Sequence, residues 1–368
     1  MTSDDDAKRG PRGTLRLTPK PRTERLSAGD TAARSRASKS GTRDDRARRA
    51  DPRRTPAPED AARDPRGPVL LPGIRVGDRF EIVELTDEGA TARIYKADQV
   101  TMGRTVALKM VHVRDAPARA RKRVRDEIRA LIRLDHPNVV RIIDAGQWDD
   151  WIYVVEEWLR GTTLRRFMLE RGRIPRKEAL ELAVQMLAGL GAAHAAKIVH
   201  RDLKPENVFV TETGAVKLLD FGLAKSMDAS GSSSRGLLVG TPGYMAPERL
   251  MPLPERVKND PRADLFSFGV ILYEMLAGAH PYKFGRKRLS AEQLALYMAS
   301  FDPPVLAAEP LELWKLIART ISRYPDERPA SADIIVRELR RILAVPALPV
   351  APPARSGRSQ LVAAVARS

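Results

Sequence analysis

The sequence His200-Arg201-Asp202-Leu203-Lys204-Pro205-Glu206-Asn207 places a carboxylate, an ammonium group and an amide within six positions of one loop. Asp202 can accept a proton from a hydroxyl group, Lys204 can balance charge on a moving phosphoryl group, and Asn207 can offer its amide oxygen to Mg²⁺. Any two of these residues would fit a solvated turn equally well. All of them in this order indicate a site that handles phosphate and metal.

Two further motifs stand at matching positions in the chain. Asp220-Phe221-Gly222 begins 18 residues after Asp202, and Val106-Ala107-Leu108-Lys109 lies upstream. Each alone is a common short sequence, but together with the first stretch they match a known set of catalytic signatures. The sequence therefore resembles the eukaryotic-type serine/threonine protein kinases, in their bacterial branch. The resemblance covers roughly residues 75–343.

This resemblance implies transfer of the γ-phosphate of ATP to serine or threonine hydroxyls of protein substrates, with Mg²⁺ or Mn²⁺ as the metal. Lys204 is the serine/threonine-type signature. The implied catalytic residues are Asp202, Lys204, Lys109 and Glu127. The implied metal ligands are Asn207 and Asp220. The residues implied in nucleotide binding are Gly89, Ile94, Ala107, Lys109, Glu157, Leu159 and Phe209.

The same resemblance implies several contacts that hold the site together. Lys109 is expected to pair with Glu127, and Glu248 of Ala246-Pro247-Glu248 is expected to pair with Arg328. Asp264 is expected to accept hydrogen bonds from the backbone of the loop His200–Asn207, the catalytic loop that the resemblance implies, because a buried carboxylate needs such partners. An apolar stack between the two lobes is expected from His200, Phe221, Leu131 and Ile142.

The sequence departs from the family pattern around the nucleotide. Of the three glycines expected in the phosphate loop only Gly89 remains, while Asp87 and Glu88 add negative charge near a polyanion. Glu156 stands at the back of the adenine pocket, where it needs a partner or a raised pKa. The alternative to an active enzyme is therefore a pseudokinase or scaffold that binds nucleotide weakly.

A serine-rich segment follows the second motif. Arg201 is expected to face it without a fixed partner, so a phosphate on one of these serines could bind that guanidinium and order the segment. Thr241 is expected to contact the catalytic loop instead. The protein itself is then one of its substrates; a plain Gly/Ser linker is the alternative. The segment contains Ser226, Ser230, Ser232, Ser233 and Ser234, and the last four are the expected phosphate acceptors.

Apolar alternation and helical periodicity predict a strand-rich region followed by a helix-rich region. The resemblance implies that these form an α+β, two-lobed protein kinase fold, with a small antiparallel sheet lobe that contains one helix and a larger helical lobe. The expected strands are Arg79–Leu85, Ala92–Ala97, Thr105–Val111, Val140–Asp144, Trp151–Glu156 and Ala215–Leu219. The expected helices are Pro117–Leu134, a helix through Leu180 to His194, Ala263–Ala277, Ala291–Ser300, Leu311–Ser322 and Ser331–Leu343.

Composition sets the boundaries of the kinase domain. We expect a disordered basic tail over 1–68, the domain over 69–345 with its N-lobe at about 75–157 and its C-lobe at about 158–345, and a disordered tail over 346–368. The first tail interleaves 18 basic with 11 acidic residues, which favours a solvated linker.

The remaining composition excludes several classes of protein. With no cysteine there is no disulfide framework or thiolate metal site. No apolar run approaches the roughly 20 residues that span a bilayer, so a cytoplasmic protein without a membrane span is expected. The formal net charge of +17 raises nucleic acid as a partner only through the basic tail.

Overall fold

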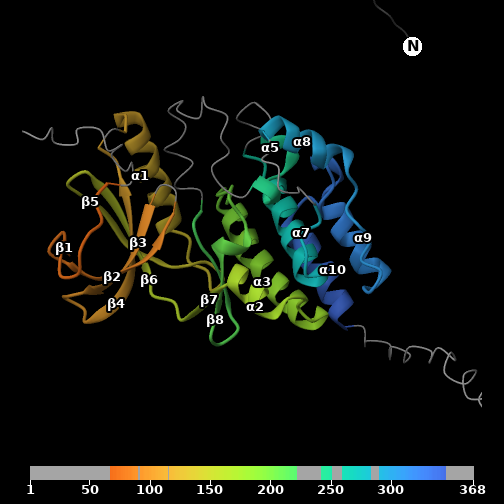
Figure 1. The fold of residues 1–368 in the computed structure, drawn as a ribbon, viewed down its shortest axis with the longest axis horizontal. Coiled ribbons are helices and arrows are strands. Elements are labelled where there is room, and N and C mark those ends of the chain that lie inside the picture. The colour runs from red at the N-terminus through yellow and green to blue at the C-terminus, as the bar shows by residue number, and fades with distance from the viewer. Residues whose placement is uncertain are drawn as a thin grey trace, which may run out of the picture. The chain divides into compact units, whose positions relative to one another are not determined.

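A six-stranded antiparallel sheet forms the first part of the described chain (Figure 1). The computed structural model describes residues 67–89, 92–114, 116–221, 242–250, 259–282 and 290–344. The strands lie in the order β1-β2-β3-β4-β6-β5. Their bounds are Arg75–Val76 (β1), Phe80–Glu88 (β2), Ala92–Gln99 (β3), Arg104–His112 (β4), Ile142–Trp148 (β5) and Trp151–Glu157 (β6).

Strand β4 shows how alternation separates the two faces of this sheet. Leu108 lies opposite Tyr95 on β3 and Val155 on β6, and all three side chains are fully buried in one apolar core. The next residue, Lys109, lies opposite Ile94. Because successive side chains point to opposite faces, Lys109 is directed away from this core.

Helix α1 (Ala118–Ile132) follows β4 and lies along one side of the sheet (Figure 1). Its buried residues recur at intervals of three and four, which gives the helix one apolar stripe. They are Ala120, Val124, Ile128 and Leu131. Glu127 lies at the edge of this stripe and is half-buried.

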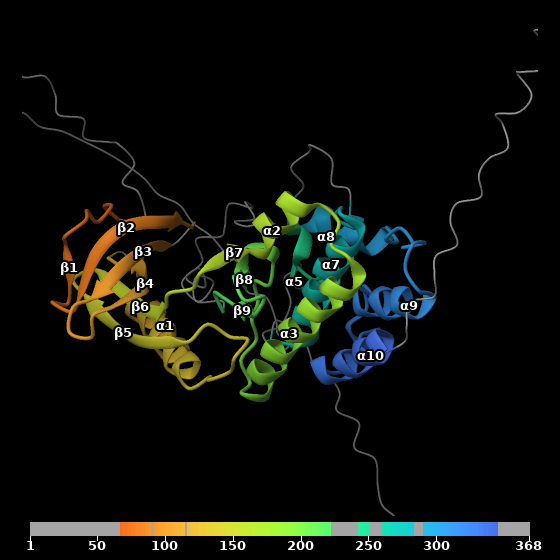
Figure 2. The same ribbon diagram turned by 90° about the horizontal axis from the view of Figure 1, so that it is seen from below.

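The second part of the chain is mainly helical (Figure 2). A small antiparallel sheet contains β7 (Gly161–Thr163), β8 (Val208–Thr211) and β9 (Val216–Leu218), in that order. The helices are α2 (Leu164–Arg171), α3 (Arg176–Ala195), α5 (Pro247–Leu250), α7 (Arg262–Ala277), α8 (Ala291–Ser300), α9 (Leu311–Thr320) and α10 (Ala332–Ala344). Single 3-10 turns lie at Pro205–Asn207, Pro242–Tyr244 and Pro325–Glu327.

Helix α7 is buried along nearly its whole length, as an all-round apolar helix must be. A Cβ atom on Gly269 would lie 2.6 Å from Cγ2 of Ile321, so only glycine permits this approach to the end of α9. The left-handed Gly278 (φ 71°) then ends the helix. This packing fixes Asp264, which lies in the first turn of α7.

The predicted fold class is confirmed, and α8 has the predicted bounds. Strand β5 lies later in the chain than predicted. The sequence predicts a strand at Val140–Asp144, whereas β5 runs from Ile142 to Trp148, because its register is set by pairing along β6. Strand β7 and helix α2 were not predicted. Strand β7 has only three residues, and α2 buries only Leu164 and Met168, which is too little for a periodic pattern.

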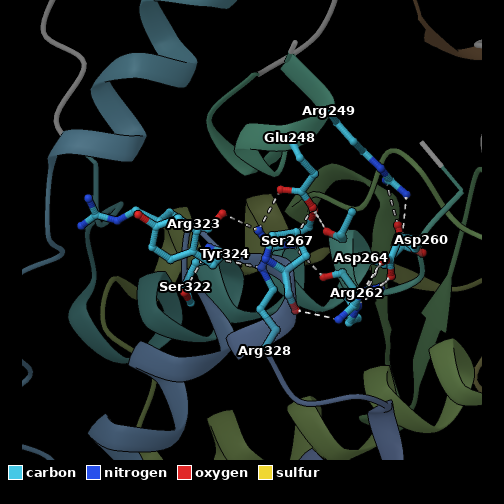
Figure 3. Close-up of polar contacts among 12 residues, drawn as sticks. Glu248, Arg249, Asp260, Arg262, Asp264, Ser267, Ser322, Arg323, Tyr324 and Arg328 are labelled. Carbon is cyan, nitrogen blue, oxygen red and sulfur yellow. Dashed lines mark hydrogen bonds and ion pairs between the residues drawn. The ribbon is translucent and has the colours of Figure 1, made fainter. Parts of the chain in front are cut away.

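The expected pair between Glu248 and Arg328 is present (Figure 3). The Nη1 and Nη2 atoms of Arg328 donate to the two carboxylate oxygens of Glu248 at 2.6 and 2.8 Å. Arg328 Nε also donates to the carbonyl of Ser322 at 2.8 Å. Its side chain is fully buried, so this pair ties α5 to the segment before α10.

Replacing Arg328 by leucine should lower the free energy of unfolding by about 3–5 kcal/mol, because Glu248 would remain buried without its counter-charge. The matched control is Arg341→Leu, since Arg341 pairs with Glu338 on the surface and its loss should change stability by less than about 1 kcal/mol. Urea unfolding midpoints of both variants test this. Equal shifts would contradict a structural role for the buried pair.

Candidate active site

The backbone of the catalytic loop is held by Asp264. Its carboxylate accepts hydrogen bonds from the N–H groups of His200 (2.7 Å) and Arg201 (3.0 Å), as the sequence predicts. Arg249 Nη1 lies 3.1 Å from the same carboxylate (Figure 3). His194 Nε2 lies 3.0 Å from it. Burial alone would raise the pKa of Asp264, but Arg249 and His194 hold that pKa well below its usual range.

Two side chains of the catalytic loop converge on Asp202. Lys204 Nζ lies 2.9 Å from Asp202 Oδ2. The amide nitrogen of Asn207 donates to the same oxygen at 3.1 Å and to the Asp202 carbonyl at 2.8 Å. The side chain of Asp202 is 30% exposed, so the fixed carboxylate still faces solvent.

The second and third motifs meet through Lys109 and Asp220. The buried ammonium of Lys109 donates to Asp220 Oδ1. Burial alone would lower the pKa of Lys109, but the carboxylates of Asp220 and Glu156 outweigh it and raise that pKa. Asp220 has a φ of 54°, a conformation in which non-glycine residues cluster at functional sites.

The expected pair between Lys109 and Glu127 is wrong. Glu127 Oε1 lies 3.3 Å from Arg201 Nη1 instead, and Arg201 Nη2 donates to Asn259 Oδ1 at 2.8 Å. Asp220 pairs with the ammonium of Lys109 on the face of β4 that carries this lysine. The half-buried Glu127 on α1 pairs with the guanidinium of Arg201. Arg201 therefore has fixed partners, contrary to the sequence prediction.

Glu156 is 8% exposed and lies opposite Ala107 in the sheet. Side chains two apart along β4 share a face, so Glu156 and Lys109 point to the same side. Burial, followed by the charge of Asp220, raises the pKa of Glu156 to about 7, although Lys109 opposes this rise. The sequence predicts that Glu156 needs either a partner or a raised pKa, and the structure gives it a raised pKa.

The residues proposed to hold the nucleotide lie around this face. Ile94 and Ala107 are half-buried on it, and Phe209 is half-buried on β8. The N–H of Glu157 donates to the Arg141 carbonyl at 3.0 Å. Within the described residues the N–H of Leu159 donates to no backbone group, so this donor is available to the adenine base of a nucleotide.

The glycine-poor hairpin is closed by its own contacts. The N–H of Gly89 donates to the Ala92 carbonyl at 2.9 Å, and Arg93 Nε lies 2.6 Å from Glu88 Oε1. The charge of Glu88, which the sequence places near the phosphates, is therefore paired with Arg93.

Two residues of the expected apolar stack are in ring contact. The rings of His200 and Phe221 lie 4.5 Å apart, and both residues are buried. Burial lowers the pKa of His200, which agrees with a structural role. Leu131 belongs to the same core as Phe221, and Ile142 packs against it.

One polar network was missed by sequence reasoning. Arg165 on α2 lies 2.9 Å from Glu206 of the catalytic loop and 3.0 Å from Glu274 on α7, and Tyr244 contacts both Arg165 and Glu274. Burial, with the charge of Glu274, raises the pKa of Tyr244. An acidic residue within the apolar pattern of α7 was the signal that could have revealed it.

These motifs and their geometry agree with the protein kinase domain family, whose pattern matches residues 80–339. The chain belongs to this family. The predicted serines Ser226, Ser230, Ser232, Ser233 and Ser234, and Thr241, lie outside the described residues of the kinase domain.

The chain is similar to bacterial proteins named as serine/threonine-protein kinases. It is 34% identical to PknL of Mycobacterium tuberculosis (strain CDC 1551 / Oshkosh) over 314 residues, which cover 83% of this chain and 75% of that protein. It is 37% identical to pkn2 of Myxococcus xanthus over 279 residues, covering 72% and 32%. The probable kinase CPE1738 of Clostridium perfringens is 32% identical over 269 residues, covering 73% and 38%. The chain thus spans less than half the length of several relatives.

Oxygen ligands for a metal are available beside the carboxylate of Asp202. Asn207 directs its nitrogen at Asp202, so its amide oxygen has no donor among the described residues. An amide oxygen and the carboxylate of Asp220 are the hard ligands that Mg²⁺ prefers, so the residues fit this ion. In the described residues no group of three or more His, Cys, Asp or Glu forms a denser metal site. No helix there is long and apolar enough to cross a membrane.

Glu156→Gln should remove a pH dependence of stability. Because the pKa of Glu156 rises from 4.5 to about 7 on folding, the protonated carboxyl contributes stability below about pH 4.5 that is lost as pH rises through 7. The wild-type Tm should therefore fall relative to that of Glu156→Gln between about pH 5 and pH 8. The exposed Glu312→Gln is the control. If the difference in Tm between the wild type and Glu156→Gln did not change with pH, the pKa of Glu156 would not be raised.

Proposed function

We propose that this chain is an ATP-dependent serine/threonine protein kinase that acts in the cytoplasm on protein substrates. The observation that carries the proposal is the convergence of Lys204 and Asn207 on Asp202, beside the contact of Lys109 with Asp220. This arrangement supplies a proton acceptor, metal ligands and cations for phosphate within one site. It matches the parts that phosphoryl transfer requires.

In the proposed reaction the oxygen of the substrate hydroxyl bonds to the γ-phosphorus of ATP, and Asp202 accepts the proton of that hydroxyl. The bond between the γ-phosphorus and the β-γ bridging oxygen breaks, and ADP leaves. Lys204 balances the negative charge that spreads over the phosphoryl oxygens. Lys109 would contact the α- and β-phosphates. Mg²⁺ held by Asn207 and Asp220 would neutralise charge on the β- and γ-phosphates. Catalysis then rests on positioning and electrostatics.

The residues around Glu156 would hold adenine. By family resemblance the base lies between Ile94, Ala107 and Phe209 and bonds to backbone groups of Glu157 and Leu159. Gly89 would lie near the phosphates. The alternative is a nucleotide-binding pseudokinase, which the single glycine favours and the retained Asp202 and Asp220 disfavour.

Asp220→Asn should abolish transfer of labelled γ-phosphate from ATP to a generic basic protein, in an assay with and without Mg²⁺. Asp202→Asn should lower the rate by about 10²–10⁴-fold, because the proton acceptor is lost. The exposed Asp333→Asn is the matched control and should keep the wild-type rate. Wild-type protein that binds ATP without any transfer would show the pseudokinase instead.

We also propose that the serine-rich segment is self-phosphorylated. A phosphate there would compete with Glu127 for Arg201, because it brings a larger negative charge and three strong acceptors. Wild-type protein incubated with Mg²⁺ and ATP should gain phosphate within residues 226–241, whereas Lys109→Ala should gain none. If the wild type phosphorylated a substrate at full rate while residues 226–241 carried no phosphate, the segment would be only a linker.

A further inference from the structure

Helix α1 has a strongly basic outer face. From Ala118 to Arg133 the chain holds seven basic residues and only two acidic ones, Asp126 and Glu127. The basic residues are Arg119, Arg121, Lys122, Arg123, Arg125, Arg129 and Arg133. All of them except the half-buried Arg121 are exposed.

Among the described residues, most of this charge has no acidic partner. Arg129 pairs with Asp126 at 3.2 Å on the surface. Within the described residues, no ion pair or hydrogen bond neutralises the side chains of Arg119, Lys122 and Arg133. A helix that packs only its apolar stripe therefore presents several unpaired cations together.

The spacing of these cations forms a line. Residues three, four and seven apart share one side of a helix, so Arg119, Lys122, Arg129 and Arg133 follow the side opposite the buried stripe. At 1.5 Å per residue the line is about 21 Å long. This length matches about six base pairs of a duplex, at 3.4 Å per step.

We infer that this face of α1 binds the phosphate backbone of duplex nucleic acid. Six of its seven basic residues are arginine, whose planar guanidinium matches phosphate with two parallel hydrogen bonds. This surface belongs to the folded domain and is distinct from the basic N-terminal tail.

Two other partners fit the face less well. An amphipathic helix that lies on a membrane needs a row of apolar side chains toward the lipid. In α1 the side chains of Val124, Ile128 and Leu131 are buried in the core, and the exposed Ile132 lies to one side of the basic line. A stable protein interface centres on buried aromatic or apolar anchors. The outer line of α1 offers none of these, so contacts to phosphate explain it best.

The test measures binding of a fluorescein-labelled 20-base-pair DNA duplex to the full chain by anisotropy, from about 50 to 200 mM salt. The triple variant Arg119→Gln, Lys122→Gln and Arg133→Gln should bind at least about tenfold more weakly and lower the slope of log K against log salt by about 2–3. The control triple Arg337→Gln, Arg340→Gln and Arg341→Gln changes the net charge equally on exposed α10 sites. It should bind like the wild type.

Arg119→Lys with Arg133→Lys keeps the charge and should retain most of the binding, which separates lost charge from lost folding. Equal losses in the two glutamine triples would overturn the inference, because they would show a net-charge effect only. Tighter binding to polyglutamate or to phosphatidylserine vesicles than to DNA would also overturn it, in favour of an acidic protein or a membrane.

Discussion

The geometry of the site depends on one buried carboxylate. Asp264 is fully buried, yet donors from the backbone and side chains of three segments keep it ionised. An ion without such partners would cost several kcal/mol to bury. Because Asp264 sits on α7, whose side chains are buried along the helix, the position of the catalytic loop is set by the packing of the helical core.

Sequence reasoning predicted the parts of the molecule that depend on local pattern. The catalytic loop and the Asp220 motif are contiguous strings whose order defines them. The alternation of β4 and the periodicity of α1 follow from burial on one face, so these elements were placed to within a few residues. Strand β7 and helix α2 bury too few side chains to leave such a pattern.

Contacts between distant segments were less predictable. The spacing of motifs does not specify how α1 stands relative to the catalytic loop, so it does not reveal that Glu127 meets Arg201 and that Lys109 meets Asp220. The network of Arg165 joins α2, the catalytic loop and α7, and no single stretch contains more than one of its members. Such pairings are properties of tertiary packing, and only the structure reveals them.

The carboxylate at Glu156 is consistent with nucleotide binding once its surroundings are considered. The site holds the ammonium groups of Lys109 and Lys204. The charge of Lys109 acts on Asp220, Glu156 and Asp202, and Lys204 pairs with Asp202. If all three carboxylates were ionised, a polyphosphate would meet a net negative site. The pKa of Glu156 is raised to about 7, so a proton can neutralise this group near neutral pH. In its protonated form Glu156 adds no negative charge to this face, so it does not compete with Asp220 for the ammonium of Lys109.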